Sequence, residues 1–318
     1  MATNLDRRDF LKRSLAASTG AALALSLEEK ALLAHAEEKP QPSAAAPDTK
    51  DFPTGKIGAV RISRLICGGN LISGYAHSRD LIYVSSLLKQ YFTDDRVFET
   101  LQVCEANGIN AAMLKLDADT IRIINKYWRE RGGAIQWIAQ ITNPDDMPGE
   151  IRNAIDLGAV GVFTTGQMGD ELVRNGQVDK LAKAVQYIKD NGAIAGVGCH
   201  EIAAVLTCEK EGVNPDFYMK TFHSHDYWSA GPAERHDSVF EETPERTIEV
   251  MQQVQKPWVA FKVLAAGAIP PRKGFEFAVR HGADFLCVGM FDFQVAEDAV
   301  IARNVLSEHR ERPRPWRA

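Results

Sequence analysis

The chain has 318 residues, a formal net charge of −5 and a hydrophobic content of 45%, which is the composition of an ordinary globular protein. Its negative charge balance gives no general attraction to nucleic acid, so we expect no nucleic-acid partner. The five cysteines are odd in number and lack C-x-x-C spacing, which argues against a disulfide framework and a structural zinc site.

Residues 1–36 have the parts of a bacterial export signal. Arg7 and Arg8 are followed by Phe-Leu-Lys, which resembles the twin-arginine consensus, and an apolar run covers residues 14–27. That run is shorter than the roughly 20 residues that span a bilayer, and an A-x-A cleavage site follows it. We expect passage through the twin-arginine export machinery to a periplasmic or extracellular location, with no stable membrane anchor. An amphipathic N-terminal helix is the alternative.

Residues 37–51 are polar and rich in Pro and Ala, and we expect them to form a disordered linker. From residue 52 short β-branched runs alternate with segments of helical periodicity. The predicted strands are Arg64–Gly68, Ile109–Leu116, Ile135–Ile141, Val160–Thr164, Ile194–Cys199, Asp216–Phe222, Trp258–Leu264 and Asp284–Val288. The predicted helices include Asp94–Asn107, Gln177–Asn191, Pro244–Gln255 and Gln294–Glu308.

Eight such units predict an α/β fold, a single (βα)8 TIM barrel over residues 52–310 with a tail at 311–318. An open doubly wound sheet is the alternative, but Gly68-Gly69-Asn70 after the first strand is not its Gly-rich fingerprint.

Chemistry in such a barrel takes place at the carboxyl ends of the strands, and polar residues follow most of the predicted strands. The candidate catalytic residues are Tyr75, His77, Lys115, Asp117 and Lys262. The candidate substrate-binding residues are Asn70, Arg79, Gln140 and Lys220. This concentration of polar groups indicates an enzyme more than a binding or structural module.

Several short motifs resemble the aldo-keto reductases. They are Gly55–Gly58 with Ile62–Asn70, Gly108–Asn110, Ile188–Gly192 with Gly196–Gly198, Phe261–Gly267 and Val288–Met290. The resemblance implies an aldo-keto reductase-like barrel and nicotinamide, NAD(P), as a cofactor. Backbone amides at Gly267, Gly289 and Met290 are the candidate contacts to that cofactor. The alternative is that the two glycines only permit tight turns.

The resemblance does not extend to the catalytic residues. Met113 stands where the family has an Asp, Thr142 where it has a Lys, and Thr164 where it has a His. Hydride transfer to a carbonyl needs a proton donor at the developing alkoxide, and Tyr75 or His77 could replace the missing one. The resemblance therefore does not imply ordinary reductase chemistry.

His200, Glu201, His223 and His225 follow the fifth and sixth predicted strands. Imidazole and carboxylate together suit a divalent metal, whereas hydrogen-bonding loops are the alternative for these residues. Side chains alternate along a strand, so Lys220 and His223 cannot both point into the barrel if the strand stays regular through residue 223.

Three lysines, Lys115, Lys220 and Lys262, lie within predicted strands. Because an unpaired buried charge is costly, we expect some of them to point inward near the top of the barrel. They predict an anion site or a Schiff-base lysine, and an ion pair of Lys115 with Asp117 is the alternative. Arg79 could clamp a carboxylate or could simply begin a helix.

Together these features predict an exported barrel enzyme that acts on a small polar substrate, sugar-like or hydroxy-carbonyl. The expected chemistry is proton transfer, as in a lyase or isomerase, with a divalent metal as an optional aid. One alternative is an NAD(P)-dependent oxidoreductase with a rearranged acid. Another is a non-catalytic periplasmic binding protein.

Overall fold

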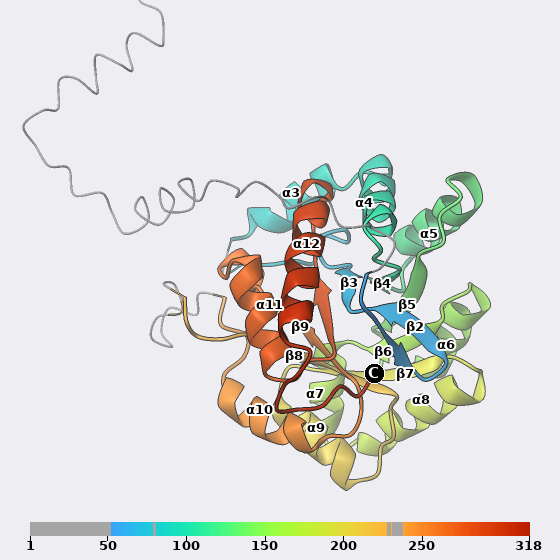
Figure 1. The fold of residues 1–318 in the computed structure, drawn as a ribbon. Coiled ribbons are helices and arrows are strands. Elements are labelled where there is room, and N and C mark those ends of the chain that lie inside the picture. Colours follow the sequence, from blue (N-terminus) through green and yellow to red (C-terminus); the bar gives the residue numbers. More distant parts are fainter. Residues whose placement is uncertain (1–51, 79–80, 228–229, 231–237) are drawn as a thin grey trace, which may run out of the picture. The chain divides into compact units, whose positions relative to one another are not determined.

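The computed structural model describes residues 52–78, 81–227, 230 and 238–318. Eight parallel strands close into a barrel in the order β10-β3-β4-β5-β6-β7-β8-β9, with helices around them (Figure 1). This confirms the predicted (βα)8 barrel. The predicted export signal, the linker and Arg79 lie outside the described residues. In the described part of the chain, no helix has both the length and the hydropathy to cross a membrane.

All eight predicted strands form, most of them with shorter ends than expected. They are β3 (Leu65–Gly68), β4 (Ala111–Lys115), β5 (Gln136–Ile141), β6 (Gly161–Thr164), β7 (Ile194–Cys199), β8 (Phe217–Thr221), β9 (Trp258–Phe261) and β10 (Phe285–Val288). Strand β9 stops before Lys262, because that residue adopts a φ of 57°, which an extended strand does not allow. Lys262 therefore lies on a turn and not within a strand as predicted.

The helices supply the crossovers that parallel strands require. Four match the predicted ones: α4 (Asp94–Ala106), α8 (Val178–Asp190), α10 (Pro244–Gln253) and α12 (Asp292–Glu308). The others are α3 (Tyr83–Tyr91), α5 (Ala118–Glu130), α6 (Met147–Asp156), α7 (Gly166–Arg174), α9 (Ile202–Lys210) and α11 (Pro271–Arg280), with a short 3-10 turn η2 (Ala265–Gly267).

An antiparallel hairpin precedes the barrel and closes its lower end. It consists of β1 (Thr54–Ile57) and β2 (Val60–Ser63), joined by a turn in which Gly58 has a φ of 55°. Ile57 and Ile62 are fully buried and belong to the same apolar cluster as the interior of the barrel.

Side chains of the barrel strands divide between two apolar clusters, one inside the barrel and one between strands and helices. The inner cluster contains, among others, Ile66, Ala111, Met113, Ile138, Phe163, Phe217, Met219, Phe261 and Cys287. Because side chains alternate along a strand, Lys115 points inward two residues beyond Met113. Lys220 shares the outward face of β8 with Tyr218, which belongs to the outer cluster.

Residues 311–318, expected to form a tail, pack beneath the barrel. Arg314 is buried, and its guanidinium donates to Asp284 at 2.6 Å, while Arg312 donates to the other oxygen of Asp284 at 2.9 Å. Asp284 also accepts from the backbone N–H of Trp258 at 2.9 Å. This carboxylate therefore ties the C-terminal segment to β9 and β10.

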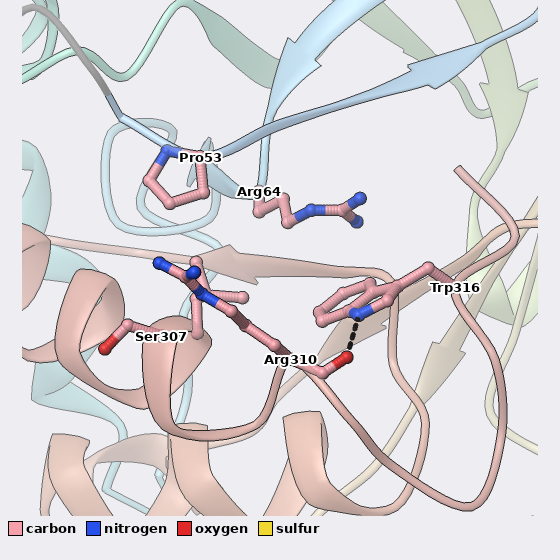
Figure 2. A pocket seen from close by; sticks show the side chains of 6 residues that line it. Pro53, Arg64, Ser307, Arg310 and Trp316 are labelled. Carbon is pink, nitrogen blue, oxygen red and sulfur yellow. Dashed lines mark hydrogen bonds between the residues drawn. The ribbon is translucent and has the colours of Figure 1, made fainter.

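A small pocket of ≈ 240 Å³ lies at this lower end, lined by Pro53, Arg64, Leu306, Ser307, Arg310 and Trp316. Figure 2 shows Arg64 and Arg310 facing it, with the Trp316 indole bonded to the Arg310 carbonyl at 3.0 Å. Arg64 stacks over Trp316 at 4.0 Å. Because chemistry in such barrels occurs at the opposite end, we assign this region to stability.

The variant Asp284→Ala tests how much the ion pairs of Asp284 with Arg312 and Arg314 contribute to stability. Removing the carboxylate leaves two buried guanidinium groups without their ion-pair partner, so the free energy of unfolding should fall by about 3–5 kcal/mol, measured by urea denaturation. The control Asp179→Ala removes an exposed ion pair with Lys183, which should leave the free energy of unfolding nearly unchanged. Equal effects of the two variants would contradict this assignment.

Candidate functional site

Five side chains gather where β7 and β9 end, and we call them the mouth cluster. His77 comes from the segment between β3 and α3, Asp170 from α7, His200 follows β7, Phe240 precedes α10 and Lys262 follows β9. The carboxyl ends of the strands are where (βα)8 barrels place their active sites, so this cluster is the candidate site.

Asp170 and His200 form a buried hydrogen-bonded pair. The Asp170 carboxylate is 4% exposed and lies 2.9 Å from His200 Nδ1. It also accepts from the backbone N–H groups of His200 and Glu201. A carboxylate at Nδ1 favours the tautomer that carries its proton there, which leaves His200 Nε2 as a proton acceptor.

Gly166 and Phe261 restrict the space around the His200 ring. A Cβ on Gly166 would lie only 2.5 Å from His200 Cε1, so the ring occupies the space that any side chain at this position would need. The Phe261 ring is also close, at a centroid distance of 5.5 Å. These contacts fix the direction of Nε2.

Lys262 is a half-buried cation with no carboxylate partner in the described part of the chain. Its ammonium lies 4.0 Å above the Phe240 ring. Burial lowers the pKa of Lys262 to about 8, against the opposing charge of Asp170. Its φ of 57° is strained for a non-glycine residue, and such strain and pKa shifts occur mainly at functional sites.

His77 completes the cluster from the first loop. Its ring meets Phe240 edge to face at 5.0 Å. Burial lowers the pKa of His77, and the positive charge of Lys262, together with that of His200 whenever its ring is protonated, lowers it further. The mouth cluster therefore holds three basic groups in electrostatic contact, with one carboxylate, Asp170, among them.

The loop that carries Phe240 is fixed from below by a buried ion pair. Lys220, fully buried, donates to Glu241 at 2.6 Å, and the backbone N–H groups of Phe240 and Glu241 both donate to His223 Nε2 at 3.0 Å. Burial lowers the pKa of His223 to about 4, so the ring is neutral and can accept these bonds. Lys220 and His223 thus hold Phe240 in place, and neither is open to substrate.

Each of the four residues predicted as metal ligands bonds to another protein group, and His223 does so through the backbone N–H groups of Phe240 and Glu241. His200 pairs with Asp170, Glu201 pairs with Arg174 at 2.8 Å, and His225 Nε2 lies 2.5 Å from the Glu241 carbonyl. Within the described ranges no three His, Cys, Asp or Glu side chains lie close enough to hold a metal ion. Metal binding by these four residues stays a prediction, and the mechanism proposed below does not use a metal.

Lys115 and Tyr75 meet on another side of the mouth. Lys115 Nζ donates to the Tyr75 hydroxyl at 2.9 Å and lies 4.3 Å from the centre of its ring. Asp117, the predicted ion-pair partner of Lys115, instead caps α5 by accepting from the Thr120 N–H at 2.9 Å. The structure therefore brings together two of the predicted catalytic residues and assigns a capping bond to the third.

Two predicted substrate-binding residues lie nearby. Asn70 is exposed, and its backbone carbonyl accepts from Tyr75 and Ala76. Gln140 pairs in register with Lys115 across β4 and β5, and it shares the inward face of β5 with Ile138 of the inner cluster.

The motif resemblance to the aldo-keto reductases implies a nicotinamide, and the residues expected to contact it lie in the loops after β9 and β10. The amides of Ala265, Gly267 and Ile269 all donate to carbonyls of their own loop. Met290 is buried, and a Cβ on Gly289 would lie 3.0 Å from Leu71. The Gly267 amide is therefore not free to bind a phosphate. Nicotinamide binding at Gly289 and Met290 stays a prediction, and we derive no step through it.

Sequence reasoning missed Asp170, Phe240 and Thr221. Thr221 ends β8 and is fully buried, and its hydroxyl has no hydrogen-bond partner in the part of the chain described, an unusual state for a buried polar group. The one signal for Asp170 was its place a few residues after the fourth predicted strand. For Phe240 and Thr221 we find no such signal.

No protein-family model and no curated protein matches the chain. Two similar solved structures are each described as a "putative aldo-keto reductase" from Pseudomonas aeruginosa. One is 17% identical, with a TM-score of 0.56 over 80% of this chain and 94% of that chain. The other is 16% identical, with a TM-score of 0.58 over 83% and 100%.

A third similar structure is phospho-2-dehydro-3-deoxyheptonate aldolase from Thermotoga maritima, at 11% identity and a TM-score of 0.51 over 81% of this chain and 74% of that chain. At such identities the likeness shows the fold alone. The predicted aldo-keto reductase-like barrel is thereby confirmed.

The Asp170–His200 pair is tested by Asp170→Asn. An amide at this position no longer favours the Nδ1-protonated ring, so 15N NMR should show His200 change from a single tautomer to a mixture. Glu171→Gln, an exposed neighbour on α7, should leave the His200 signals unchanged. A wild-type ring protonated at Nε2 would contradict the assignment.

Proposed function

We propose that the protein is a lyase or isomerase that acts on a small hydroxy-carbonyl compound. In this proposal Lys262 forms an iminium with the substrate carbonyl and His200 Nε2 moves the proton. The single observation that carries the proposal is the half-buried Lys262 ammonium, without a carboxylate partner among the described residues, in the same cluster as the Asp170–His200 pair.

The first step requires a neutral amine. The free amine of Lys262 adds to the carbonyl carbon, and the resulting carbinolamine loses water to give the iminium. With a pKa of about 8, about one Lys262 in ten is uncharged at pH 7, against fewer than one in a thousand for an ordinary lysine. Burial over Phe240 therefore prepares the nucleophile.

The second step is proton transfer next to the iminium. In the isomerase case a proton leaves the carbon next to the iminium, and the electron pair of that C–H bond forms a C=C bond while the C=N π electrons move onto nitrogen, which gives an enamine. In the lyase case the proton leaves a hydroxyl on the carbon one position further along, its C–O bond becomes C=O, and the electron pair of the broken carbon–carbon bond forms the enamine. His200 Nε2 receives the proton, and Asp170 stabilises the imidazolium that results. Return of the proton to another carbon gives an isomerase, and cleavage of a carbon–carbon bond gives a lyase.

Borohydride trapping tests Lys262 without knowledge of the natural substrate. The full chain, incubated with small oxo and hydroxy-carbonyl compounds and sodium cyanoborohydride, should gain the mass of one ligand less one oxygen atom, on Lys262. The rate should rise with pH and level off above about 8, since the amine is protonated below its pKa.

Lys262→Met should abolish this labelling, and Lys273→Met, at an exposed position on α11, should retain it. Labelling that persists in Lys262→Met, or wild-type labelling with a pH midpoint near that of an ordinary lysine, would refute the role of Lys262.

An oxidoreductase with a rearranged acid is the second candidate. The observation that favours it is the 2.9 Å hydrogen bond between Lys115 and Tyr75, since a phenol beside an ammonium can donate a proton to a developing alkoxide. Native mass spectrometry of the purified full chain decides whether a nicotinamide or a metal is bound, and a binding protein without catalysis would show ligand-induced thermal stabilisation but no turnover.

We also propose export through the twin-arginine machinery, on the sequence of the first 36 residues. Replacing both Arg7 and Arg8 by Lys should keep the protein in the cytoplasm, as measured by cell fractionation with immunoblotting. Arg13→Lys, a change of the same type outside the pair, should leave export intact. Equal distribution of the two variants would argue against this route.

A further inference from the structure

We infer that the Thr221 hydroxyl binds a hydroxyl group that the substrate carries on the carbon next to its carbonyl. This inference rests on the function proposed for Lys262, and it assigns the residue that recognises the hydroxy-carbonyl class.

Thr221 is the last residue of β8, and its side chain points into the barrel. Met219, two residues earlier, belongs to the inner cluster, whereas Tyr218 and Phe222 belong to the outer one. Because side chains alternate along a strand, Thr221 shares the inward face with Met219. It lies at the carboxyl end of the strand, which is the end where such barrels place their chemistry.

Thr221 lies between the strands that carry His200 and Lys262, because β8 is the neighbour of both β7 and β9. On one side Thr221 pairs in register with Phe261, and Lys262 is the next residue. On the other side the last register pair of β7 and β8 comes directly before His200 and Thr221. Adjacent strands are about 4.8 Å apart, so one strand spacing separates Thr221 from its neighbour on each side.

The side chains of the mouth cluster converge at this end of β8. The His200 ring comes from the end of β7, yet its centroid lies only 5.5 Å from that of Phe261 on β9, two strands away. The charge of Asp170, which bonds His200 at 2.9 Å, also acts on Lys262. The proposed base and the proposed nucleophile therefore meet beside Thr221.

The Thr221 hydroxyl differs from other buried threonine hydroxyls in having no partner. Thr164, at the end of β6, accepts from the Gly198 N–H at 3.1 Å, and Thr247 donates to Glu241 at 3.1 Å. Thr221 is fully buried, and the residues that the structure describes offer its hydroxyl no hydrogen bond. An unpaired buried hydroxyl is costly, and a ligand that bonds to it removes that cost.

A hydroxyl next to the substrate carbonyl is the group that fits this position. In the isomerase case Lys262 holds the carbonyl carbon and His200 takes a proton from the next carbon. A hydroxyl on that carbon would lie between the two residues, at the end of β8. The Thr221 hydroxyl is neutral and can both donate and accept, as a substrate hydroxyl does.

The experiment compares hydroxyacetone with butanone, in which a methyl group replaces the hydroxyl, in cyanoborohydride labelling of Lys262 in the full chain. Thr221→Val exchanges the hydroxyl for a methyl group. It should raise the half-saturating concentration of hydroxyacetone about two- to tenfold, the range of one neutral hydrogen bond, and leave that of butanone unchanged. Because the two ketones differ in reactivity, the ratio of their half-saturating concentrations is compared between variants.

Two variants serve as controls for the labelling. Thr221→Ser keeps the hydroxyl and should keep the wild-type ratio. Thr207→Val makes the same exchange at a half-buried position on α9, outside the barrel, and should also keep it.

The urea midpoint of unfolding separates ligand binding from a structural role. Because the Thr221 hydroxyl bonds to no described protein group, Thr221→Val should unfold at the same urea concentration as the wild type or at a higher one. Thr164→Val removes the acceptor of the Gly198 N–H and should unfold at a lower one. An equal drop for both variants would show that the Thr221 hydroxyl is bonded within the protein, and would overturn the inference.

The labelling outcomes separate the two proposals. If no carbonyl compound labels the wild type, the function proposed for Lys262 fails, and the role of Thr221 fails with it. If both ketones label the wild type and Thr221→Val leaves their ratio unchanged, the role of Thr221 is overturned and Lys262 keeps its own.

Discussion

The alternation of side chains along eight strands that close on themselves is the constraint on which the rest of this structure depends. Each strand side chain points either into the barrel or toward the helices, and both sides are largely apolar. A charged side chain therefore needs a partner on the side to which it points. Lys220 faces outward and pairs with Glu241. Lys115 faces inward at the end of its strand and meets Tyr75. Lys262 leaves the strand by a turn and lies over an aromatic ring.

Buried carboxylates organise both ends of the barrel. Asp284 accepts from two arginines and from backbone N–H groups, and so fixes the C-terminal segment below the strands. Asp170 is equally buried and accepts from two backbone N–H groups and one ring, His200. The same physical device, a desolvated acceptor that needs several donors, therefore stabilises one end and orients a base at the other.

The mouth and the lower end of the barrel differ in the partners of their cationic side chains. Below the barrel, the guanidinium groups of Arg312 and Arg314 share one carboxylate. At the mouth, Lys262 is desolvated beside Phe240, the residues that the structure describes offer it no carboxylate partner, and its pKa falls to about 8. The ion pair of Lys220 with Glu241 stabilises the loop that carries Phe240. The ion pair of Lys220 thus helps to hold the ring that lies beside Lys262, the lysine whose pKa is lowered.

The sequence by itself determined the barrel, because a two-residue period and a helical period alternate along the chain and leave few ways to bury both kinds of apolar face. It also determined which strand ends carry polar groups, including Lys115, His200 and Lys262. Only the tertiary structure decided their partners. Asp170 reaches His200 across 30 residues and Phe240 reaches His77 from a distant loop, and no local period encodes such contacts. The direction and pKa of a side chain follow from these neighbours, since burial and nearby charge are properties of the folded chain.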